Sequence, residues 1–402
     1  MSGLYKLQGV IQNYAWGGTE FIPKLLGSKP NEVKCAEYWL GAHNNATSTV
    51  FKGGNEIKLN ALISKDTKAN LGLNISEKFG RLPFLFKVLD VHDMLSIQVH
   101  PSKKEAEKGF KKENKLGIPL TASNRNYKDD NHKPEIMVAL SEFWLLHGFL
   151  TEKKLITCLN STPELSHLVT DFKNDGYLGL YKKLMEESQE VTNTVLQPLI
   201  ERVLPLYKQG ELDKNSPDYW AAKAYETFCI EGFIDKGIYS IYLFNIVQAN
   251  KGEAVFQDAG IPHAYLEGQN MELMANSDNV LRGGLTPKHV DVPELLKHVE
   301  FQETIPNIMQ GELQTDGIER IYKSPAPDFE LSQLVFSKEK SNYTNISKTA
   351  IIYIVVNGNA KIEDSDISIE IKKGEAIVVL AESNYSIEAE GDAILYKATA
   401  PV

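Results

Sequence analysis

The chain has 402 residues, of which 42% are hydrophobic and 24% are charged, so it contains enough apolar material for more than one folded domain. With 53 acidic and 43 basic residues its net charge is −10, which argues against a nucleic-acid-binding protein with a broad basic face. The three cysteines are scattered and no apolar run approaches the roughly 20 residues of a membrane span, so we expect a cytoplasmic protein without disulfides or a membrane segment.

Up to about residue 150, short β-rich runs alternate with turn residues such as the glycine pairs at 17–18 and 53–54. The runs PFLFKVLDV, LSIQVH, EIMVAL and FWLLHGFL have the length and composition of strands. Among them, the stretch PSKKEAEKGFKKENK places Ser102 and Glu105 at capping-box spacing. We therefore expect a short solvated helix there rather than a basic binding patch.

The stretch SIQVHP, residues 96–101, places a polar face on an otherwise apolar strand. Every second residue is polar, namely Ser96, Gln98 and His100, and the residues between them are apolar. Strand residues two apart lie about 7 Å apart at Cα, so Gln98 and His100 are close enough to bind a single ion. A lone inward histidine is more often simply hydrogen-bonded, so this motif alone is weak evidence for a metal.

A second polar pair follows in NHKPEIMVAL. Lys133 and Glu135 lie on one side of this predicted strand, and Ile136, Val138 and Leu140 lie on the other. Burying either charge alone is costly, so each needs an ion, a partner or a substrate. A plain Lys–Glu pair at a strand edge is the simpler alternative.

From about residue 151 to 235 the pattern is helical. NSTPELSHLV and KNSPDYWAAKAYETF each place Ser or Thr and then Pro before a periodic segment, which is a helix-start signal. Hydrophobic residues repeat at helical spacing within 178–185 and within 195–204. Pro198 interrupts the second repeat, so we expect that helix to begin near it.

β-rich sequence returns at IYSIYLFNIVQ, from residue 238, and the last 80 residues after KSPAPDF are again a series of strands. Many short, mainly antiparallel strands favour sandwiches or barrels over a doubly wound sheet. We therefore predict a discontinuous β domain of residues 1–150 and 236–318, a helical insertion of residues 151–235, and a smaller C-terminal β domain of residues 319–402.

The segment from 258 to 288, DAGIPHAYLEGQNMELMANSDNVLRGGLTPK, concentrates polar residues beside apolar ones. They are His263, Tyr265, Glu272, Asp278, Arg282 and Lys288. Together with the two earlier motifs this yields a set of nitrogen and oxygen ligands without sulfur, consisting of Gln98, His100, Glu135 and His263. Such a set suits Zn²⁺ or another divalent ion.

With NYAWGG at 13–18, these three segments resemble the signature blocks of type I phosphomannose isomerase, or mannose-6-phosphate isomerase, a zinc-dependent family of the cupin superfamily. The resemblance extends from Asn13 to Lys288 and includes the helical insertion. It implies a mainly β fold with a cupin (jelly-roll) catalytic domain, the helical insertion, and a second, smaller C-terminal jelly-roll domain. For the last 80 residues only the strand pattern supports this.

The resemblance also implies a reaction, namely the interconversion of mannose 6-phosphate and fructose 6-phosphate through an enediol-type intermediate. It places one zinc ion per chain on Gln98, His100, Glu135 and His263. Its catalytic arginine corresponds to Arg282. Its substrate-pocket positions correspond to Trp16, Ser96, Lys133, Tyr265, Glu272, Asp278 and Lys288. The expected partner is a small sugar phosphate, with no nucleic acid and no membrane, and we expect a monomer.

The general base is open between two residues. Glu272 can serve if desolvation raises its pKa, and Lys133 can serve if burial beside the metal lowers its pKa. Glu272 is slightly favoured, and the alternative is that it only orients a pocket residue. Arg282 and Lys288 are candidates for binding phosphate or enediolate oxygens.

Two rival functions come from other classes. An iron-dependent cupin oxygenase could use His100, Glu135 and His263, but it has little need for three cationic residues nearby. A non-catalytic sugar-binding cupin would retain the fold and could lose the base and the metal ligands. Here all of them are present in the sequence, which counts against that alternative.

Overall fold

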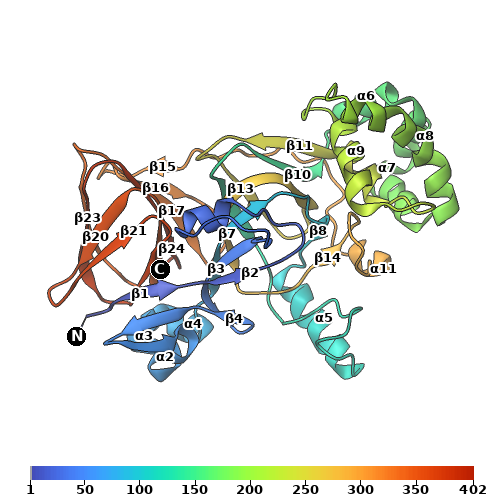
Figure 1. The fold of residues 1–402 in the computed structure, drawn as a ribbon. Coiled ribbons are helices and arrows are strands. Elements are labelled where there is room, and N and C mark those ends of the chain that lie inside the picture. The colour runs from blue at the N-terminus through green and yellow to red at the C-terminus, as the bar shows by residue number, and fades with distance from the viewer. Residues whose placement is uncertain (1) are drawn as a thin grey trace.

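The computed structural model describes residues 2–402 and consists of three β-sheets with a block of helices at one end (Figure 1). The strands within each sheet pair antiparallel. The predicted mainly β fold with a helical insertion is therefore confirmed. The C-terminal strands, coloured orange to red, lie at the opposite end from the helical block.

The nine-stranded sheet joins both ends of the chain. Its first strand, β1, pairs with β22 on one side and with β5 on the other. The C-terminal strands therefore share this sheet with strands from the start of the chain, a connection that the sequence did not indicate. In spatial order the strands are β15 (Glu312–Leu313), β16 (Glu319–Tyr322), β17 (Glu330–Phe336), β24 (Ala393–Thr399), β19 (Ile351–Asn357), β22 (Ala376–Val379), β1 (Leu4–Gln8), β5 (Thr49–Lys52) and β6 (Asn55–Lys58).

A four-stranded sheet packs on that part of the nine-stranded sheet that the C-terminal strands form. Its strands, in order, are β18 (Asn342–Ile346), β23 (Asn384–Ala389), β20 (Asn359–Glu363) and β21 (Ser368–Lys372). Between the two sheets lies an apolar core that includes Leu334, Tyr353 and Ile387. The alternation of apolar and polar residues along strands such as β23 directs one side of each strand into this core.

The eleven-stranded sheet carries the three polar motifs found in the sequence. Its main path is β11 (Phe244–Ala249), β10 (Phe143–Phe149), β13 (His263–Ala275), β7 (Phe84–Val91), β3 (Glu37–His43) and β2 (Val10–Gln12). The remaining strands are β4 (Ala46–Thr47), β8 (Gln98–Val99), β9 (Glu135–Ala139), β12 (Ala254–Gln257) and β14 (Leu281–Arg282). Strand β13 is central, because it pairs with β7, β8, β9 and β10.

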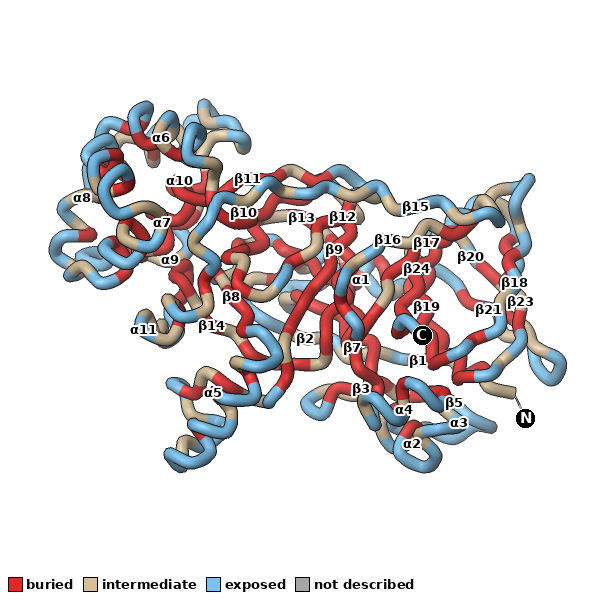
Figure 2. Tube along the Cα trace, turned by 180° about the vertical axis from the view of Figure 1, so that it is seen from behind, coloured by how far each residue is buried: buried red, intermediate tan, exposed pale blue. Residues whose placement is uncertain are grey.

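A second apolar core lies between the eleven-stranded and nine-stranded sheets and includes Phe86, Leu273 and Ile352. Figure 2 shows the strands of this central body as buried, whereas the helices at its periphery bury one side and leave the other exposed. Those helices are α1 (Phe21–Leu25), α2 (Leu59–Lys65), α3 (Thr67–Leu71), α4 (Leu73–Phe79), α5 (Lys103–Lys115) and α11 (Val292–Leu295). In α5, Ser102 accepts a hydrogen bond from the backbone N–H of Glu105, which confirms the predicted cap.

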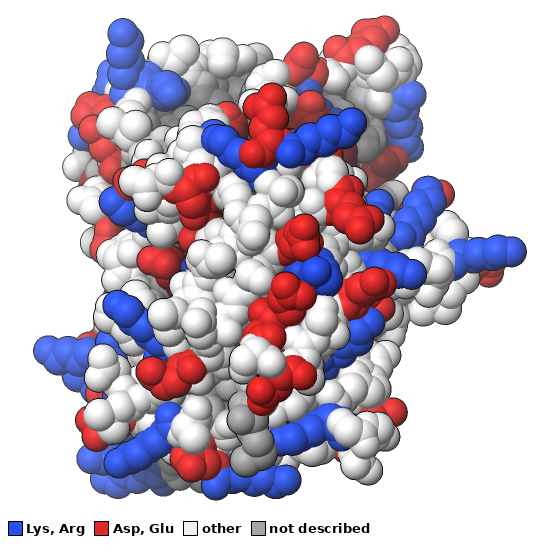
Figure 3. Space-filling view, turned by 90° about the vertical axis from the view of Figure 1, so that its left-hand side faces the viewer, with Lys and Arg blue, Asp and Glu red and all other residues white. Residues whose placement is uncertain are grey.

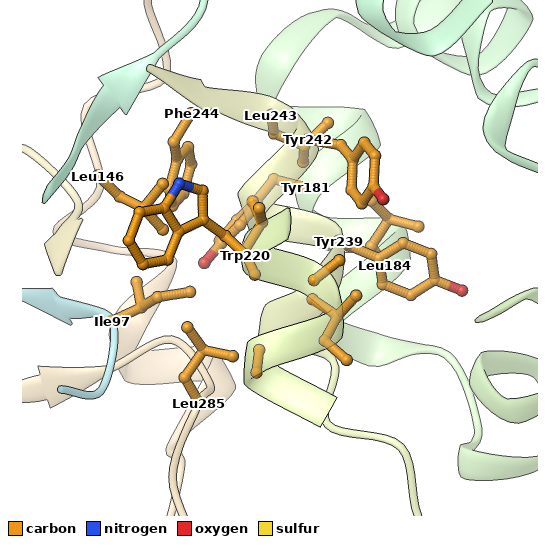
Figure 4. Packing of buried hydrophobic residues seen from close by; sticks show 14 of the residues in the cluster. Ile97, Leu146, Tyr181, Leu184, Trp220, Tyr239, Tyr242, Leu243, Phe244 and Leu285 are labelled. Atoms are coloured by element: carbon orange, nitrogen blue, oxygen red, sulfur yellow. The ribbon is translucent and has the colours of Figure 1, made fainter. Parts of the chain in front are cut away.

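The helical block packs on the far end of the eleven-stranded sheet through a third core (Figure 4). Trp220 of the block lies in this core together with Leu146 of β10 and Ile97 next to β8. The block contains α6 (Glu152–Ser161), the short helix η1 (Pro163–Leu165), α7 (Leu168–Glu186), α8 (Gln189–Lys208), α9 (Pro217–Phe228) and α10 (Gly237–Leu243).

Two details of the helical block differ from the sequence predictions. Helix α8 begins at Gln189, with Ser188 as its cap, and continues through Pro198, because a buried face that includes Leu196, Leu199 and Val203 supports it on both sides of the proline. The segment IYSIYL is the helix α10 rather than a strand. All seven residues of α10 are buried, so packing in the core outweighs the β propensity of its isoleucines and tyrosines.

The face at the C-terminal end of the molecule shows acidic and basic side chains interspersed (Figure 3). On this face the charges form no broad basic area, in keeping with the net charge of −10. None of the helices in residues 2–402 has the combination of length and apolar character needed to cross a bilayer.

Candidate active site

A buried cluster of two histidines and a carboxylate lies where β8, β9 and β13 meet. His100 follows β8, Glu135 begins β9 and His263 begins β13, and all three are at least 97% buried. His100 Nε2 lies 3.4 Å from Glu135 Oε1, and His263 Nε2 lies 3.3 Å from Glu135 Oε2. The three candidate ligand atoms lie within 4.8 Å of one another. The sheet thus assembles residues that are far apart in the sequence.

Hydrogen bonds set the orientation of both imidazole rings. His100 Nδ1 donates to the backbone carbonyl of Asn279 at 2.8 Å, and His263 Nδ1 donates to that of Ile261 at 2.9 Å. Each Nε2 is buried and has no hydrogen-bond partner among the described residues. Burial and the charge of Lys133 lower the pKa of His100 to about 4, against the opposing effect of Glu135, so this ring is neutral near pH 7.

The neutral His100 ring therefore presents the lone pair of Nε2 to Glu135 Oε1. Although burial opposes it, the positive charge of Lys133 together with His100 holds the pKa of Glu135 well below its ordinary range. Two ligands at about 2.0–2.1 Å from one tetrahedral ion lie roughly 3.3–3.4 Å apart, which matches the two distances between Nε2 and the carboxylate. These residues fit a divalent cation, and Zn²⁺ suits their nitrogen and oxygen donors.

Asn279 connects His100 to the loop that precedes Lys133 and Glu135. Its side chain is fully buried and accepts hydrogen bonds from the backbone N–H of Lys128 at 2.7 Å and of Asp129 at 3.2 Å. Its Nδ2 donates to the carbonyl of Asn131 at 2.8 Å. One residue therefore fixes both the loop conformation and, through its own carbonyl, the tautomer of a candidate ligand.

A cavity of about 660 Å³ opens beside the cluster. Of the sequence-predicted residues, it is lined by Trp16, Ser96, Gln98, Lys133, Asp278, Arg282 and Lys288. Ser96 and Gln98 of the predicted polar face of SIQVHP thus line this cavity, although only Gln98 and Val99 of that run form strand β8. In the main-chain pairing Gln98 lies opposite both His263 and Arg282, so β8 connects the cluster to the cavity wall.

Two cations in the cavity wall have no acidic partner. Arg282 and Lys288 form no ion pair with any residue of 2–402. Desolvation lowers the pKa of both groups, and the charge of Arg282 lowers that of Lys288 further. Two neighbouring cations without a carboxylate form a favourable place for an anion.

Two predicted residues, Tyr265 and Glu272, lie behind the cavity rather than in its wall. Tyr265 is 4% exposed and packs edge-on against Phe143, and its hydroxyl has no hydrogen-bond partner among the described residues. Glu272 is 3% exposed and accepts a hydrogen bond from Lys87 at 2.8 Å. Burial raises the pKa of Glu272 against the opposing charge of Lys87.

Asp278 lines the cavity, where its carboxylate is 3.4 Å from His43 Nε2 and accepts a hydrogen bond from Asn45 at 2.9 Å.

The predicted pair of Lys133 and Glu135 does form, because Lys133 Nζ lies 2.5 Å from the Glu135 carboxylate. The same carboxylate also faces the two histidines.

Lys87, Glu37 and Trp39 are among the residues of the cavity wall that were not predicted from the sequence. Lys87 pairs with Glu272 and lies 3.6 Å from Glu37, and its ammonium group is over the Trp39 ring at 5.3 Å from the centroid. Burial lowers the pKa of Lys87, but these carboxylates outweigh burial and raise it above its ordinary value. The available signal was a lysine within the run PFLFKVLDV, which is apolar apart from Lys87 and Asp90 and is buried throughout.

The chain is similar to known phosphomannose isomerases over almost its whole length. Residues 4–152 match the family model described as phosphomannose isomerase type I, catalytic domain. The chain is 35% identical to mannose-6-phosphate isomerase from Escherichia coli (strain K12), covering 96% of this chain and 98% of that one. It is 31% identical to mannose-6-phosphate isomerase 2 from Arabidopsis thaliana, covering 98% of this chain and 93% of the relative.

Solved structures agree with these matches. The structure superposes on that of mannose 6-phosphate isomerase from Salmonella typhimurium bound to substrate and a zinc atom, with a TM-score of 0.88, 33% identity and full coverage of both chains. A zinc-bound holo structure of mannose 6-phosphate isomerase matches with the same TM-score, identity and coverage. Likeness over the whole of both chains confirms the predicted mainly β, cupin-like fold.

Proposed function

The chain belongs to the type I phosphomannose isomerases, and from this premise we propose that it interconverts mannose 6-phosphate and fructose 6-phosphate with one zinc ion. The observation that carries the proposal is the buried His–Glu–His cluster beside a cavity with two unpaired cations. The ligands proposed are Gln98, His100, Glu135 and His263. When bound, zinc supplies Lewis acidity, which stabilises negative charge on the substrate oxygens by several kcal/mol.

The reaction moves one proton between neighbouring carbons and needs no external oxidant. In the open-chain aldose a base removes the proton from C2, and the C–H electron pair forms the double bond between C1 and C2. The C1 carbonyl oxygen takes up the displaced electron pair and a proton, which produces the enediol. The C2 hydroxyl then loses its proton as the C2 carbonyl forms, and C1 receives a proton.

For the base, the geometry supports Lys133 for direct contact with the substrate. Lys133 lines the cavity, whereas Glu272 lies behind Lys87 and is not in the wall. Lys133 can accept a proton only as the neutral amine. This requires that Glu135, its partner in the ion pair, binds the zinc ion instead. Glu272, slightly favoured from sequence, would act on the substrate through Lys87. The kinetics of Lys133→Met and Glu272→Gln distinguish these roles, because loss of the direct base lowers kcat most.

We assign the substrate phosphate to Lys288 and the enediolate oxygens to Arg282. Arg282 is held by the pairing of β14 with β8, opposite Gln98, and so lies nearer the proposed zinc ligands. Lys288 lies at the exposed end of the same segment, suited to a phosphate that enters from solvent. Trp16, Ser96 and Asp278 are proposed as further substrate contacts, with Tyr265 as support behind the cavity wall.

The experiment that tests the function is a coupled assay on mannose 6-phosphate with the purified chain, before and after treatment with a chelator. We expect conversion to fructose 6-phosphate, its loss on chelation, and its return when Zn²⁺ is added. Activity that survives complete removal of metal would overturn the zinc proposal. Oxygen consumption with an iron-loaded sample, in place of isomerisation, would favour the oxygenase alternative.

We propose that the division into residues 1–150 with 236–318, 151–235 and 319–402 describes functional units, with the chemistry in the first. In support, every residue assigned above to zinc or substrate comes from the first unit. We further propose a monomer acting in the cytoplasm on a small sugar phosphate. Size-exclusion chromatography with light scattering tests the oligomeric state.

A further inference from the structure

Asp235 carries a buried carboxylate outside the cluster and the cavity wall. It lies between α9 and α10 and is 4% exposed. It accepts hydrogen bonds from three backbone N–H groups, those of Gly237 at 2.7 Å, Leu285 at 2.8 Å and Thr286 at 3.1 Å. It forms no ion pair within residues 2–402. Because an isolated buried charge is costly, these N–H groups supply its compensation.

The chain segment that Asp235 holds has an unusual conformation. Gly284 has φ 111° and Leu285 has φ 53°, and Leu285 is one of two non-glycine residues with positive φ in residues 2–402. A leucine rarely adopts this region, because its Cβ crowds the backbone, so the surroundings must hold it there. Its side chain is fully buried in the core that also contains Ile97, as labelled in Figure 4.

Two glycine backbones meet at this point. A Cβ on Gly284 would lie 2.6 Å from Gly237 Cα, and a Cβ on Gly237 would lie 2.5 Å from the backbone nitrogen of Leu285. This close approach brings the N–H groups of both segments onto one carboxylate. We call this arrangement, Asp235 with the N–H groups of Gly237, Leu285 and Thr286, the Asp235 clamp.

The clamp leads directly to the cavity wall. Leu285, Thr286, Pro287 and Lys288 all line the cavity, and the backbone N–H of Lys288 donates to Thr286 Oγ1 at 3.1 Å. Arg282, in contrast, is held by the strand pairing of β14 with β8. The clamp therefore acts on the position of Lys288 and much less on that of Arg282.

We propose that Asp235 is a positioning residue that sets Lys288 for the substrate phosphate and thereby connects the end of the helical insertion to substrate affinity. The inference rests on the proposed function, in which Lys288 binds the phosphate. Asp235 itself does not touch the substrate. Its effect is to hold a backbone conformation that Thr286 and Lys288 do not hold alone.

Asp235→Asn tests this, because an amide retains one acceptor oxygen and turns an N–H donor toward one of the three backbone donors. We expect KM for mannose 6-phosphate to rise about ten- to a hundredfold, kcat to change much less, and zinc content to stay at the wild-type level. In the Asp235→Asn, Lys288→Ala double variant the effects should be far from additive, since both act on one contact.

A readout independent of catalysis is amide hydrogen exchange of residues 283–288, which should quicken in Asp235→Asn. The matched control is Asp218→Asn, in the same helical region, whose carboxylate binds Tyr242 and Arg202. This control should lower stability and leave KM unchanged. Should Asp235→Asn not fold, Thr286→Val removes the link to Lys288 and is expected to raise KM in the same way.

Several results would overturn the inference. Unchanged exchange at 283–288 in folded Asp235→Asn would do so whether or not the wild type isomerises mannose 6-phosphate, so this outcome is separate from failure of the proposed function. The inference would also be wrong if Asp235→Asn changed kcat alone or lost its zinc. Effects of Asp235→Asn and Lys288→Ala that add fully in the double variant would contradict it as well.

Discussion

His100 donates its Nδ1 proton to the backbone carbonyl of Asn279 over 2.8 Å, so the orientation of a proposed zinc ligand depends on a residue that does not itself bind the metal. The Asn279 side chain forms hydrogen bonds with the backbone of the 128–131 loop, which precedes Lys133 and Glu135. Two of the proposed ligands therefore depend on one buried amide.

Replacing Asn279 with alanine should weaken zinc binding by about 10–100-fold, because the carbonyl that orients His100 and the loop before Glu135 both lose their support. Competition with a chelator measures the affinity. Asn193→Ala is the control, since that side chain also ties backbone segments together but lies in the helical block. Equal zinc affinity in the two variants would show that Asn279 acts on stability alone.

Replacing His100 with alanine should abolish both zinc retention and activity while the protein remains folded. The remaining nitrogen and oxygen atoms are too few to close a tetrahedral site. Metal analysis of the purified variant, with circular dichroism as a check on folding, tests this. His167→Ala, at an exposed position, should retain metal. A His100→Ala protein with one equivalent of tightly bound zinc would contradict the ligand assignment.

Arg282→Ala and Lys288→Ala should fail in different ways. Losing an interaction made chiefly in the transition state should lower kcat by about 10²–10³ for Arg282→Ala, with KM changed less. Lys288→Ala should raise KM with a smaller effect on kcat, as expected for a phosphate contact. Steady-state kinetics on mannose 6-phosphate compare them. If Arg282→Ala altered KM alone, the two roles would be exchanged.

Glu272→Gln should destabilise the protein by about 3–5 kcal/mol, because it leaves Lys87 buried with only the more distant Glu37 as a partner. Urea denaturation measures the change. Asp171→Asn, which breaks the more exposed pair with Lys183, is the control and should cost about 1 kcal/mol or less. A loss as small as that of the control would indicate that water or another group compensates Lys87.

The sequence identified the part of the site that alternation and composition can reveal. The strand period predicted the polar face of SIQVHP and the pair Lys133 and Glu135, and the concentration of polar residues in 258–288 pointed to His263. The structure brings these residues together. The grouping of the three segments came from the family resemblance, because no local pattern shows that β8, β9 and β13 are neighbours.

What the sequence could not provide depends on tertiary packing. In the sequence Lys87 is one charged residue within a mainly apolar strand. Its carboxylate partners, Glu37 and Glu272, come from β3 and β13, so only the fold shows that the lysine is paired. Helix α10 has the residues of a strand and becomes a helix only because the surrounding core buries it on all sides. Asp235 carried no motif at all. Its role arises from two glycine backbones that meet only in the fold.

The position of β1 between β22 and β5 has a consequence for how the chain folds. Leu4 pairs with Val379, whereas Leu7 pairs with Val50, so one neighbour of β1 is available early in synthesis and the other only after residues 376–379 have been made. Contacts between such distant residues slow folding. Until they form, the edge of β1 is open to pairing with other chains, so a ribosome-bound nascent chain should depend on chaperone protection for most of its synthesis.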